Sequence, residues 1–232
     1  MRTFKSLAVA VALAAAFAAP AQAQIRITEV APWSSGNSPV AADWFELTNI
    51  GSAAVNISGW KVDDNSFSFG SSAALNGVSG IAAGQSVIFV EGTSVQTNAF
   101  ISNWFGAGAP AGFAIGSYTG TGIGLSTAGD GVIIFDAGGS QQAKVSFGAS
   151  PSVSPTFRSF DNSIGLDNTT ISALSNVGIN GAFSVVHPLA GVATTEIGSP
   201  GLTAAVPEPE SYALMLAGLA LIGSIVRRRR FA

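Results

Sequence analysis

The chain offers few residues that could do acid–base or nucleophilic chemistry. It has a single histidine, His187, and no cysteine, which removes disulfides, thiolate chemistry and zinc–sulfur sites. His187 ends an apolar run and precedes Pro188. Its nearest partners in sequence, Ser184 and Glu196, lack the context of a nucleophile, such as a serine between glycines on a tight turn. We therefore expect a surface or capping histidine and predict no catalytic residue.

Acidic turns are the candidates for metal binding. Asp63-Asp64-Asn65 could offer carboxylate and amide oxygens to Ca²⁺, but it lacks the alternating acidic spacing and distal glutamate of an EF-hand. A solvated turn with a side-chain-to-backbone hydrogen bond is the favoured interpretation, here and at Asp161-Asn162 and Asp167-Asn168. The glycine-rich Gly120–Gly124 has no following helix or lysine, so it is not a phosphate loop. We predict no metal and no cofactor.

One alternative activity concerns sugars. Paired carboxylates such as Asp43 and Glu46 are the only candidates for glycoside hydrolysis. Trp33, Trp44 or Trp104, if exposed on one flat face, could stack on sugar rings. These residues keep open a secreted carbohydrate-binding or glycan-processing protein as the second function class.

Composition and charge narrow the possible partners. Only 23 of 232 residues are charged, and hydrophobic residues make up 47%, which excludes a disordered charged chain. Between residues 25 and 206 there are 4 basic and 11 acidic residues, a net charge of 4 − 11 = −7. Such a body repels phosphate backbones, so we predict no nucleic-acid partner.

The first 23 residues have the layout of a secretory signal peptide. Arg2 and Lys5 precede an apolar run over Leu7–Ala19, and the small residues Ala21 and Ala23 occupy the two cleavage-pocket positions. We expect signal peptidase to cut after Ala23 and the chain to be exported. An N-terminal membrane helix is the alternative, but the apolar run is short for one.

The other end of the chain combines a linker, an apolar segment and a basic cluster. Residues 204–210 form a Pro/Glu linker, and residues 211–226 carry no charge. As a helix this segment spans roughly 24 Å, slightly less than the hydrocarbon core, which snorkelling arginine stems can compensate. We predict a transmembrane helix over 211–226 and a cytoplasmic tail over 227–232, by the positive-inside rule. The basic residues that stop the membrane span are Arg227, Arg228, Arg229 and Arg230.

Residues 25–203 between these ends favour one β domain. The strand over Asp43–Ile50 alternates in polarity, while Val87–Val90 and Val132–Phe135 are continuous apolar runs typical of strands covered on both faces. We find no convincing amphipathic helix of ten or more residues, only a possible helical turn near Asn98–Phe105. The many short strands predict an all-β, antiparallel immunoglobulin-like sandwich. The candidate strands are Ile25–Ala31, Asp43–Ile50, Ala54–Lys61, Ser86–Glu91, Thr121–Leu125, Gly131–Phe135, Gln141–Phe147 and Ala182–His187.

The C-terminal segment resembles the PEP-CTERM sorting signal of Gram-negative bacteria. The resemblance rests on the Pro-Glu-Pro triplet, a short apolar helix and a terminal arginine cluster in that order. It implies that Pro207, Glu208 and Pro209 are recognised by the membrane protease exosortase, which cuts near the triplet. It also implies an inner-membrane stage followed by the cell surface or the extracellular space. Two prolines keep the triplet out of a helix, which suits entry into a protease cleft.

The body resembles the lamin-tail domain, an immunoglobulin-like sandwich found in nuclear lamins and in many secreted bacterial proteins. The resemblance covers most of residues 25–202, is strongest in the first 60 of them, and fails between Ser150 and Ala193. It implies a fold and no catalytic residues. The segments that carry it are Ile25–Val30, Asp43–Gly51, Val55–Asp64, Ile81–Gln85, Leu125–Asp136 and Gly198–Gly201.

Several of these positions have a direct physical interpretation. Trp60 after Gly59 is expected to fill the core, and Asn49-Ile50-Gly51 to form a turn with glycine at positive φ. Glu29 and Glu46 should lie on the solvent face or accept hydrogen bonds from a turn backbone. The sequence thus favours a non-enzymatic surface or biofilm-matrix protein whose partners include exopolysaccharide or other surface proteins.

Overall fold

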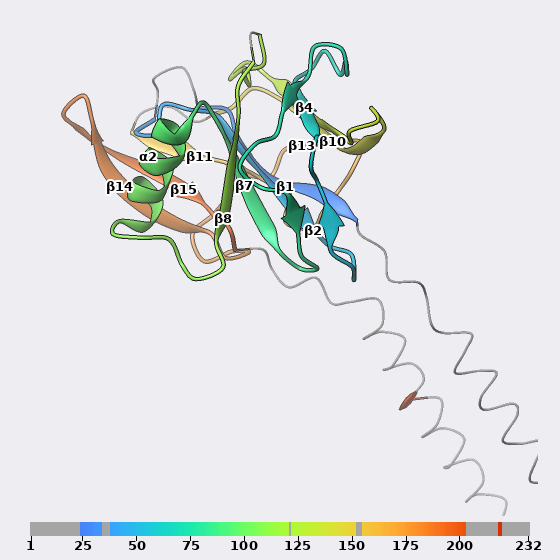
Figure 1. Ribbon diagram of the computed structural model, residues 1–232. Helices are drawn as coiled ribbons and strands as arrows, with labels where there is room; N and C mark the ends of the chain where they lie inside the picture. Colours follow the sequence, from blue (N-terminus) through green and yellow to red (C-terminus); the bar gives the residue numbers. More distant parts are fainter. Residues whose placement is uncertain (1–23, 34–37, 121, 152–154, 203–217, 220–232) are drawn as a thin grey trace, which may run out of the picture. The chain divides into compact units, whose positions relative to one another are not determined.

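The computed structural model describes residues 24–33, 38–120, 122–151, 155–202 and 218–219 (Figure 1). The chain divides into two units, and the unit over Ala23–Val206 contains nearly all of the described residues. The signal peptide, the Pro-Glu-Pro triplet, the arginine cluster and nearly all of the expected transmembrane segment lie outside the described residues. Within the described residues, no helix is long and apolar enough to cross a membrane.

A five-stranded sheet forms the middle layer of the body. Its strand β2 is buried along its whole length, because alternate side chains face two different cores. Phe45 and Leu47 point to one core and Trp44 to the other. The strand order is β12 (Phe160–Asp161), β1 (Ile25–Ala31), β2 (Trp44–Asn49), β7 (Ser86–Glu91) and β8 (Ala114–Tyr118).

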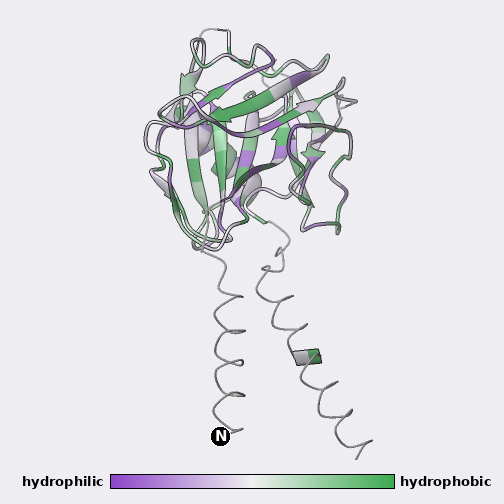
Figure 2. Ribbon diagram, turned by 90° about the vertical axis from the view of Figure 1, so that its right-hand side faces the viewer, coloured by the Kyte–Doolittle hydropathy of each residue, from purple (hydrophilic) through white to green (hydrophobic). Residues whose placement is uncertain are grey.

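A second five-stranded sheet packs on one face of the first, and aliphatic and phenylalanine side chains fill the first core between them. Trp60 is 6% exposed in this core, which confirms the sequence interpretation. Figure 2 shows the hydrophobic residues that line the strands of the body. The strand order is β13 (Thr169–Ile171), β10 (Gln141–Phe147), β9 (Asp130–Phe135), β4 (Lys61–Asp63) and β5 (Ala73–Ala74).

A third layer covers the opposite face of the middle sheet. It consists of helix α2 (Ser94–Phe105) and a three-stranded sheet with the order β11 (Thr156–Arg158), β15 (Val192–Gly198) and β14 (Phe183–Leu189) (Figure 1). Thr93 and Gln96 form a capping box that starts the helix. The second core, between this layer and the middle sheet, is centred on Trp33, Trp44, Trp104, Phe100 and Phe157. A separate pair, β3 (Val55–Asn56) and β6 (Gly80–Ile81), completes the strands.

The all-β class is confirmed, with corrections to its details. Three strand pairs are parallel, β7–β8, β10–β13 and β11–β15, so the sandwich is not wholly antiparallel. The helix is 12 residues long rather than a single turn, because its buried side chains Phe100 and Trp104 contribute to the second core. Residues 122–125 form no strand, and Ala54–Lys61 is split by a turn at Gly59. Gly51 does not adopt positive φ, and its N–H donates a hydrogen bond to the side-chain oxygen of Asn49.

Candidate functional site

The most unusual site in the body is built on a β-bulge in β1. The register shifts between Ile27 and Glu29, so that Glu29 lies directly opposite Glu46 on β2. A bulge places two consecutive side chains on one face of a strand. As a result Thr28 and Glu29 both turn away from the first core and face the third-layer side, together with Glu46.

Glu29 accepts hydrogen bonds from the closing segment, Gly198–Leu202, at the end of the domain. One of its oxygens accepts hydrogen bonds from the Ser199 backbone N–H at 2.9 Å and from the Ser159 hydroxyl, and the other accepts from the Ser199 hydroxyl at 3.0 Å. The carboxyl is 1% exposed. Gly198 lies so close that a Cβ there would come within 2.6 Å of the Glu29 carboxyl and 3.2 Å of the Trp104 ring. Glycine is therefore the residue that allows the segment to approach.

Glu46 holds the same segment two residues further on. Its Oε2 accepts a hydrogen bond from the Gly201 N–H at 2.7 Å, and its Oε1 accepts one from the Thr28 hydroxyl at 2.6 Å. Glu46 is also 1% exposed. The sequence alternative in which these glutamates accept hydrogen bonds from a turn backbone is thus confirmed.

Both carboxyls bind protons more tightly than an ordinary glutamate. Burial, followed by the charge of Glu46, raises the pKa of Glu29 to about 8. Burial likewise raises the pKa of Glu46 to about 7, against the opposing effect of its hydrogen bonds from Thr28 and Gly201. Two carboxylates that face each other in a medium of low dielectric cannot both ionise without cost, so the pair retains a proton near neutrality.

A chain of three hydroxyls leads from this pair to the surface. Thr28 and Thr48 lie 2.8 Å apart at their hydroxyl oxygens, and Thr48 and Ser86 are also 2.8 Å apart. Ser86 in turn lines a pocket of about 340 Å³. The pocket contains Gly201, so one of its walls is the segment that the two glutamates hold. Its lining residues are Gly84, Gln85, Ser86, Pro110, Ala111, Gly112, Phe113, Pro200, Gly201 and Leu202.

The residues expected to serve glycan chemistry are not arranged for it. Trp33, Trp44 and Trp104 are 1%, 0% and 3% exposed and pack edge-to-face in the second core, so they cannot stack on sugar rings. Asp43 and Glu46 are three residues apart in an extended segment and therefore point to opposite faces. Asp43 accepts a hydrogen bond from the Leu125 N–H at 2.6 Å, whereas Glu46 pairs with Glu29.

His187 has a structural partner. Its Nε2 contacts the backbone carbonyl of Asn103, which ties β14 to α2 as expected of a capping histidine. Ser184 lies on the exposed face of β14 and His187 on the inner face, so the two do not meet. Glu196 is buried on β15, opposite Val185.

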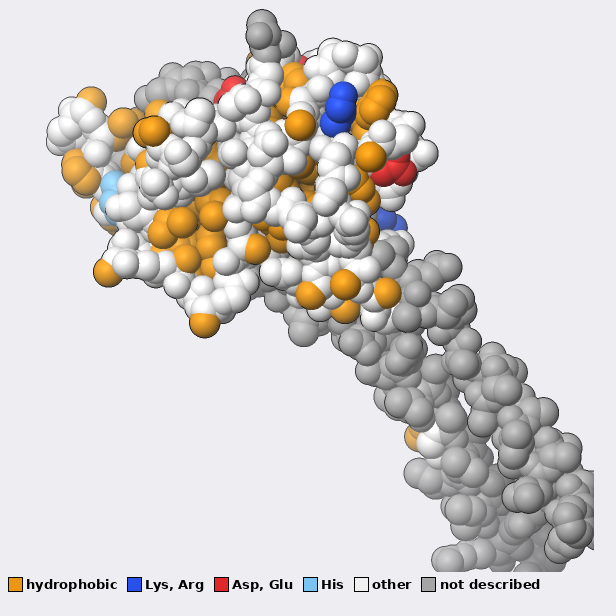
Figure 3. Space-filling model, viewed as in Figure 1, with side chains coloured by type: hydrophobic (Ala, Val, Ile, Leu, Met, Phe, Trp, Pro, Cys, Tyr) orange, Lys and Arg blue, Asp and Glu red, His pale blue; other side chains and the backbone are white. Residues whose placement is uncertain are grey.

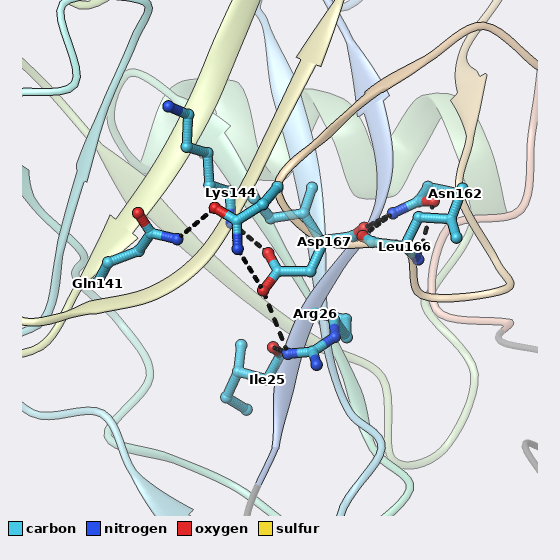
Figure 4. A network of polar contacts seen from close by, with 9 residues as sticks. Ile25, Arg26, Gln141, Lys144, Asn162, Leu166 and Asp167 are labelled. Atoms are coloured by element: carbon cyan, nitrogen blue, oxygen red, sulfur yellow. Dashed lines mark hydrogen bonds and ion pairs between the residues drawn. The ribbon is translucent and has the colours of Figure 1, made fainter.

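The acidic turns are bonded to their own backbone and neighbours. Asp64 accepts the Ser66 N–H at 3.0 Å, and Asp161 accepts the Ser163 N–H at 2.8 Å, as the turn interpretation predicts. Asp63 is buried rather than solvated and accepts hydrogen bonds from the hydroxyls of two nearby serines. Asp167 accepts the Lys144 N–H at 2.8 Å and pairs with Arg26 at 3.8 Å (Figure 4). Among the described residues, no group of three or more His, Asp or Glu side chains is placed to hold a metal ion.

The surface of the body is poor in charge. Figure 3 shows a face with few basic or acidic side chains and with apolar side chains at many points. The described apolar residues that are more than half exposed include Val95, Ile164, Val177 and Val186. Such a surface suits contact with uncharged partners more than with polyanions.

Comparison with known families settles the class of the fold. The lamin tail domain profile matches residues 18–149, more than half of the chain. The chain belongs to the lamin tail domain family. A second profile, the PEP-CTERM protein-sorting motif, matches residues 205–230. A search of curated proteins finds no match to the chain.

The lamin tail domain match ends before the third layer is complete. Strands β11, β14 and β15 and the closing segment all follow residue 149, so the sheet of the third layer lies outside the matched region, whereas its helix α2 lies inside it. The sequence does not predict the Glu29–Glu46 pair, because the two glutamates are brought together only by the register of β1 and β2. A signal was present: Thr28 and Glu29 are two successive polar residues in Ile-Arg-Ile-Thr-Glu-Val, and they break the alternation as a bulge does.

Proposed function

We propose that the chain is an exported, non-enzymatic protein of the cell surface or extracellular matrix and a substrate of exosortase. The observation that carries the proposal is the match of residues 205–230 to the PEP-CTERM sorting motif, in a chain whose residues 18–149 match the lamin tail domain. A sorting motif is read by another protein, which makes this chain the cargo rather than the catalyst.

The two terminal segments have different roles in export. The signal peptide directs the chain across the inner membrane and is removed after Ala23. The segment 211–226 then anchors the chain transiently, with Arg227–Arg230 held in the cytoplasm. Exosortase reads Pro207-Glu208-Pro209 and removes the tail, after which the protein reaches the surface or the medium.

The lamin tail domain itself acts as a binding or structural module. Support comes from the polar groups of the body: His187, the acidic turns and the paired glutamates are all engaged in contacts that hold the fold. The low surface charge suits exopolysaccharide or other surface proteins of a biofilm matrix as partners. Ser184 and His187 lie on opposite faces of β14, so His187 is not placed to activate Ser184 as a nucleophile.

The test replaces Pro207, Glu208 and Pro209 together by alanine in the full-length chain. Export should continue, while the unprocessed precursor accumulates in the inner membrane. Intact-mass measurement of the wild-type mature protein should give a C-terminus near Pro209. A matched control, Thr203→Ala with Glu210→Ala on either side of the triplet, should be processed normally.

Two results would overturn the proposal. A mature wild-type protein that keeps Arg227–Arg230 would make the tail an ordinary anchor. Equal amounts of processed protein in the envelope and medium of cells with and without exosortase would remove exosortase from the pathway.

A further inference from the structure

The closing segment, Gly198–Leu202, is held in the fold by two carboxyls that repel each other when ionised. Glu29 and Glu46 lie opposite one another on adjacent strands, and each is almost completely buried. Between them they accept three hydrogen bonds from this segment, namely the Ser199 N–H, the Ser199 hydroxyl and the Gly201 N–H. These three polar contacts of the segment therefore depend on the charge state of the pair.

The hydrogen bonds around Ser159 leave room for a proton on Glu29. The Ser159 hydroxyl contacts the Glu29 carboxyl and lies 3.3 Å from the backbone carbonyl of Ile197, which can only accept. If Ser159 donates its one hydrogen to Ile197, then its oxygen is free to accept a hydrogen from a neutral Glu29. The Ser175 hydroxyl lies 2.7 Å from Ser159 and can donate to it. A hydroxyl oxygen accepts two hydrogen bonds, so the contacts of Ser159 accommodate a protonated Glu29 without loss of a hydrogen bond.

We propose that Glu29 and Glu46 form a proton-dependent latch, which holds the closing segment while Glu29 keeps its proton and loosens it when both carboxyls ionise. The donors that reach the pair are hydroxyl and backbone N–H groups, which do not neutralise two negative charges as a cation would. Full ionisation therefore leaves two buried, mutually repelling charges.

The other ionisable groups on the surrounding elements do not replace the missing cation. Arg26 on β1 pairs with Asp167, and His187 on β14 bonds to α2. Arg158 on β11 donates hydrogen bonds to the Ser175 carbonyl and to the Asn176 side chain. Asp161 on β12 and Glu196 on β15 are acidic and can only add to the repulsion. The remaining acids of the sheet, Asp43 before β2 and Glu91 at the end of β7, lie at the ends of their strands away from Thr48 and Ser86. Helix α2 carries no ionisable side chain.

The direction of the pH dependence follows from linkage. Opening of the segment exposes the pair to water, where each pKa returns to the ordinary value near 4.5, below the raised values of about 7 and 8 in the closed fold. The closed state therefore binds protons more tightly, and it is favoured most at low pH. The opening constant should rise with pH between about 4.5 and 8, by up to about tenfold per unit for each proton released, and level off above that window.

A loosened latch would alter two neighbouring features. Pro200, Gly201 and Leu202 form one wall of the pocket, so its shape depends on the latch. The hydroxyl chain from Ser86 through Thr48 and Thr28 connects that pocket to Glu46 and offers a path by which protons reach the pair. The pocket is therefore predicted to change with pH.

Hydrogen exchange of the full-length protein, read by mass spectrometry, tests the latch. Protection of the peptide that contains Ser199 and Gly201, corrected for intrinsic exchange, should fall at least tenfold between pH 5 and pH 8 and change little from pH 8 to pH 9. Glu29→Gln imitates the protonated acid and can still donate to Ser159. This variant should keep the peptide at least as protected as in the wild type at pH 8 and should reduce the pH dependence.

Glu91→Gln is the matched control, because Glu91 is another carboxyl whose pKa is raised by burial but which does not contact the closing segment. It should leave the wild-type profile unchanged. A flat wild-type profile would overturn the proposal, as would loss of protection at every pH in Glu29→Gln.

The infrared spectrum of the wild-type protein is a second test, and it does not depend on whether a variant folds. At pH 7 the wild-type protein should show the carbonyl band of a buried protonated carboxylic acid, which weakens between pH 7 and pH 9. The band should be reduced in Glu29→Gln and retained in Glu91→Gln. Absence of any such band from the wild-type protein would contradict a stored proton.

Discussion

The two faces of the middle sheet are packed in different ways. On one face, aliphatic and phenylalanine side chains fill the first core between two sheets. On the other face, the second core gathers three tryptophans whose indole N–H groups have no hydrogen-bond partner in the described part of the chain. Glu196 lies on β15 of the layer that covers this face, and burial raises its pKa although its contact with the Ser38 side chain opposes the shift. In the first core, the described residues include one buried side-chain polar atom without a hydrogen-bond partner, the hydroxyl oxygen of Tyr118.

This difference indicates that the two cores are unequal in stability. A buried polar group without a partner costs roughly 1–3 kcal/mol, so each such group offsets part of what the apolar contacts contribute. The second core therefore stabilises less for its size than the first. The strands of its outer layer also lie beyond the residues that match the family profile. We expect the third layer to open before the two-sheet sandwich does.

The largest effect should come from the first core. Trp60→Ala removes a nearly buried ring that packs between the two sheets and should lower the free energy of unfolding by about 3–5 kcal/mol. Denaturant melts measure this directly. A loss below about 1 kcal/mol would mean that the first core does not control global stability.

The second core should respond to Trp104→Ala with a smaller and more local loss. We expect about 3 kcal/mol, at the low end for such a truncation, because the indole N–H that disappears has no partner. Hydrogen exchange should quicken in α2 and β14 while β9 and β10 keep their protection. Equal loosening of all strands would contradict two separable cores.

The sequence predicts the first core far better than the second. The strands Ile25–Ala31, Ser86–Glu91 and Gln141–Phe147 have the expected bounds, because short apolar or alternating runs carry their own signal. Strands of two or three residues, such as those at Phe160 and Thr169, give no periodicity to detect. They form because neighbouring strands offer unpaired backbone groups.

The sequence does not predict the third layer or the Glu29–Glu46 site, because both depend on contacts between distant residues. Trp33, Trp44 and Trp104 gave no indication of burial, since a solvent-facing aromatic and a core aromatic look alike until their partners are known. The partners of Trp104 include Phe183, which is 79 positions away in the sequence. The Glu29–Glu46 pair likewise depends on strand register, which single positions do not reveal.

The pH dependence of stability at Glu196 tests the third layer separately from the first core. Burial raises its pKa from 4.5 to about 7, so the folded state holds the proton more tightly than the unfolded chain. Its contribution to stability is complete below about pH 4.5 and is lost as the pH rises to about 7. Glu196→Gln should therefore match the wild type near pH 4.5 and exceed it at pH 8 by up to about 3 kcal/mol. Chemical denaturation at both pH values measures the difference, and a variant less stable than the wild type at pH 8 would show that Glu196 is ionised and paired.

The smallest effect is expected at the rim of the first core, where β1 meets the loop before β13. The Arg26–Asp167 pair has a separation of 3.8 Å and both side chains are partly exposed, so Arg26→Gln should change stability by less than about 1 kcal/mol. Asp167→Ala should cost more, about 1–2 kcal/mol, because it also removes the acceptor of the Lys144 N–H. The two variants share one ion pair, and their difference isolates the backbone hydrogen bond from the charge interaction. Melts at low and high salt complete the test: the Arg26→Gln difference should shrink with salt, whereas most of the Asp167→Ala loss should remain. If Arg26→Gln cost as much as Asp167→Ala, the rim would be held by charge, and the first core would owe part of its greater stability to an interaction that packing does not supply.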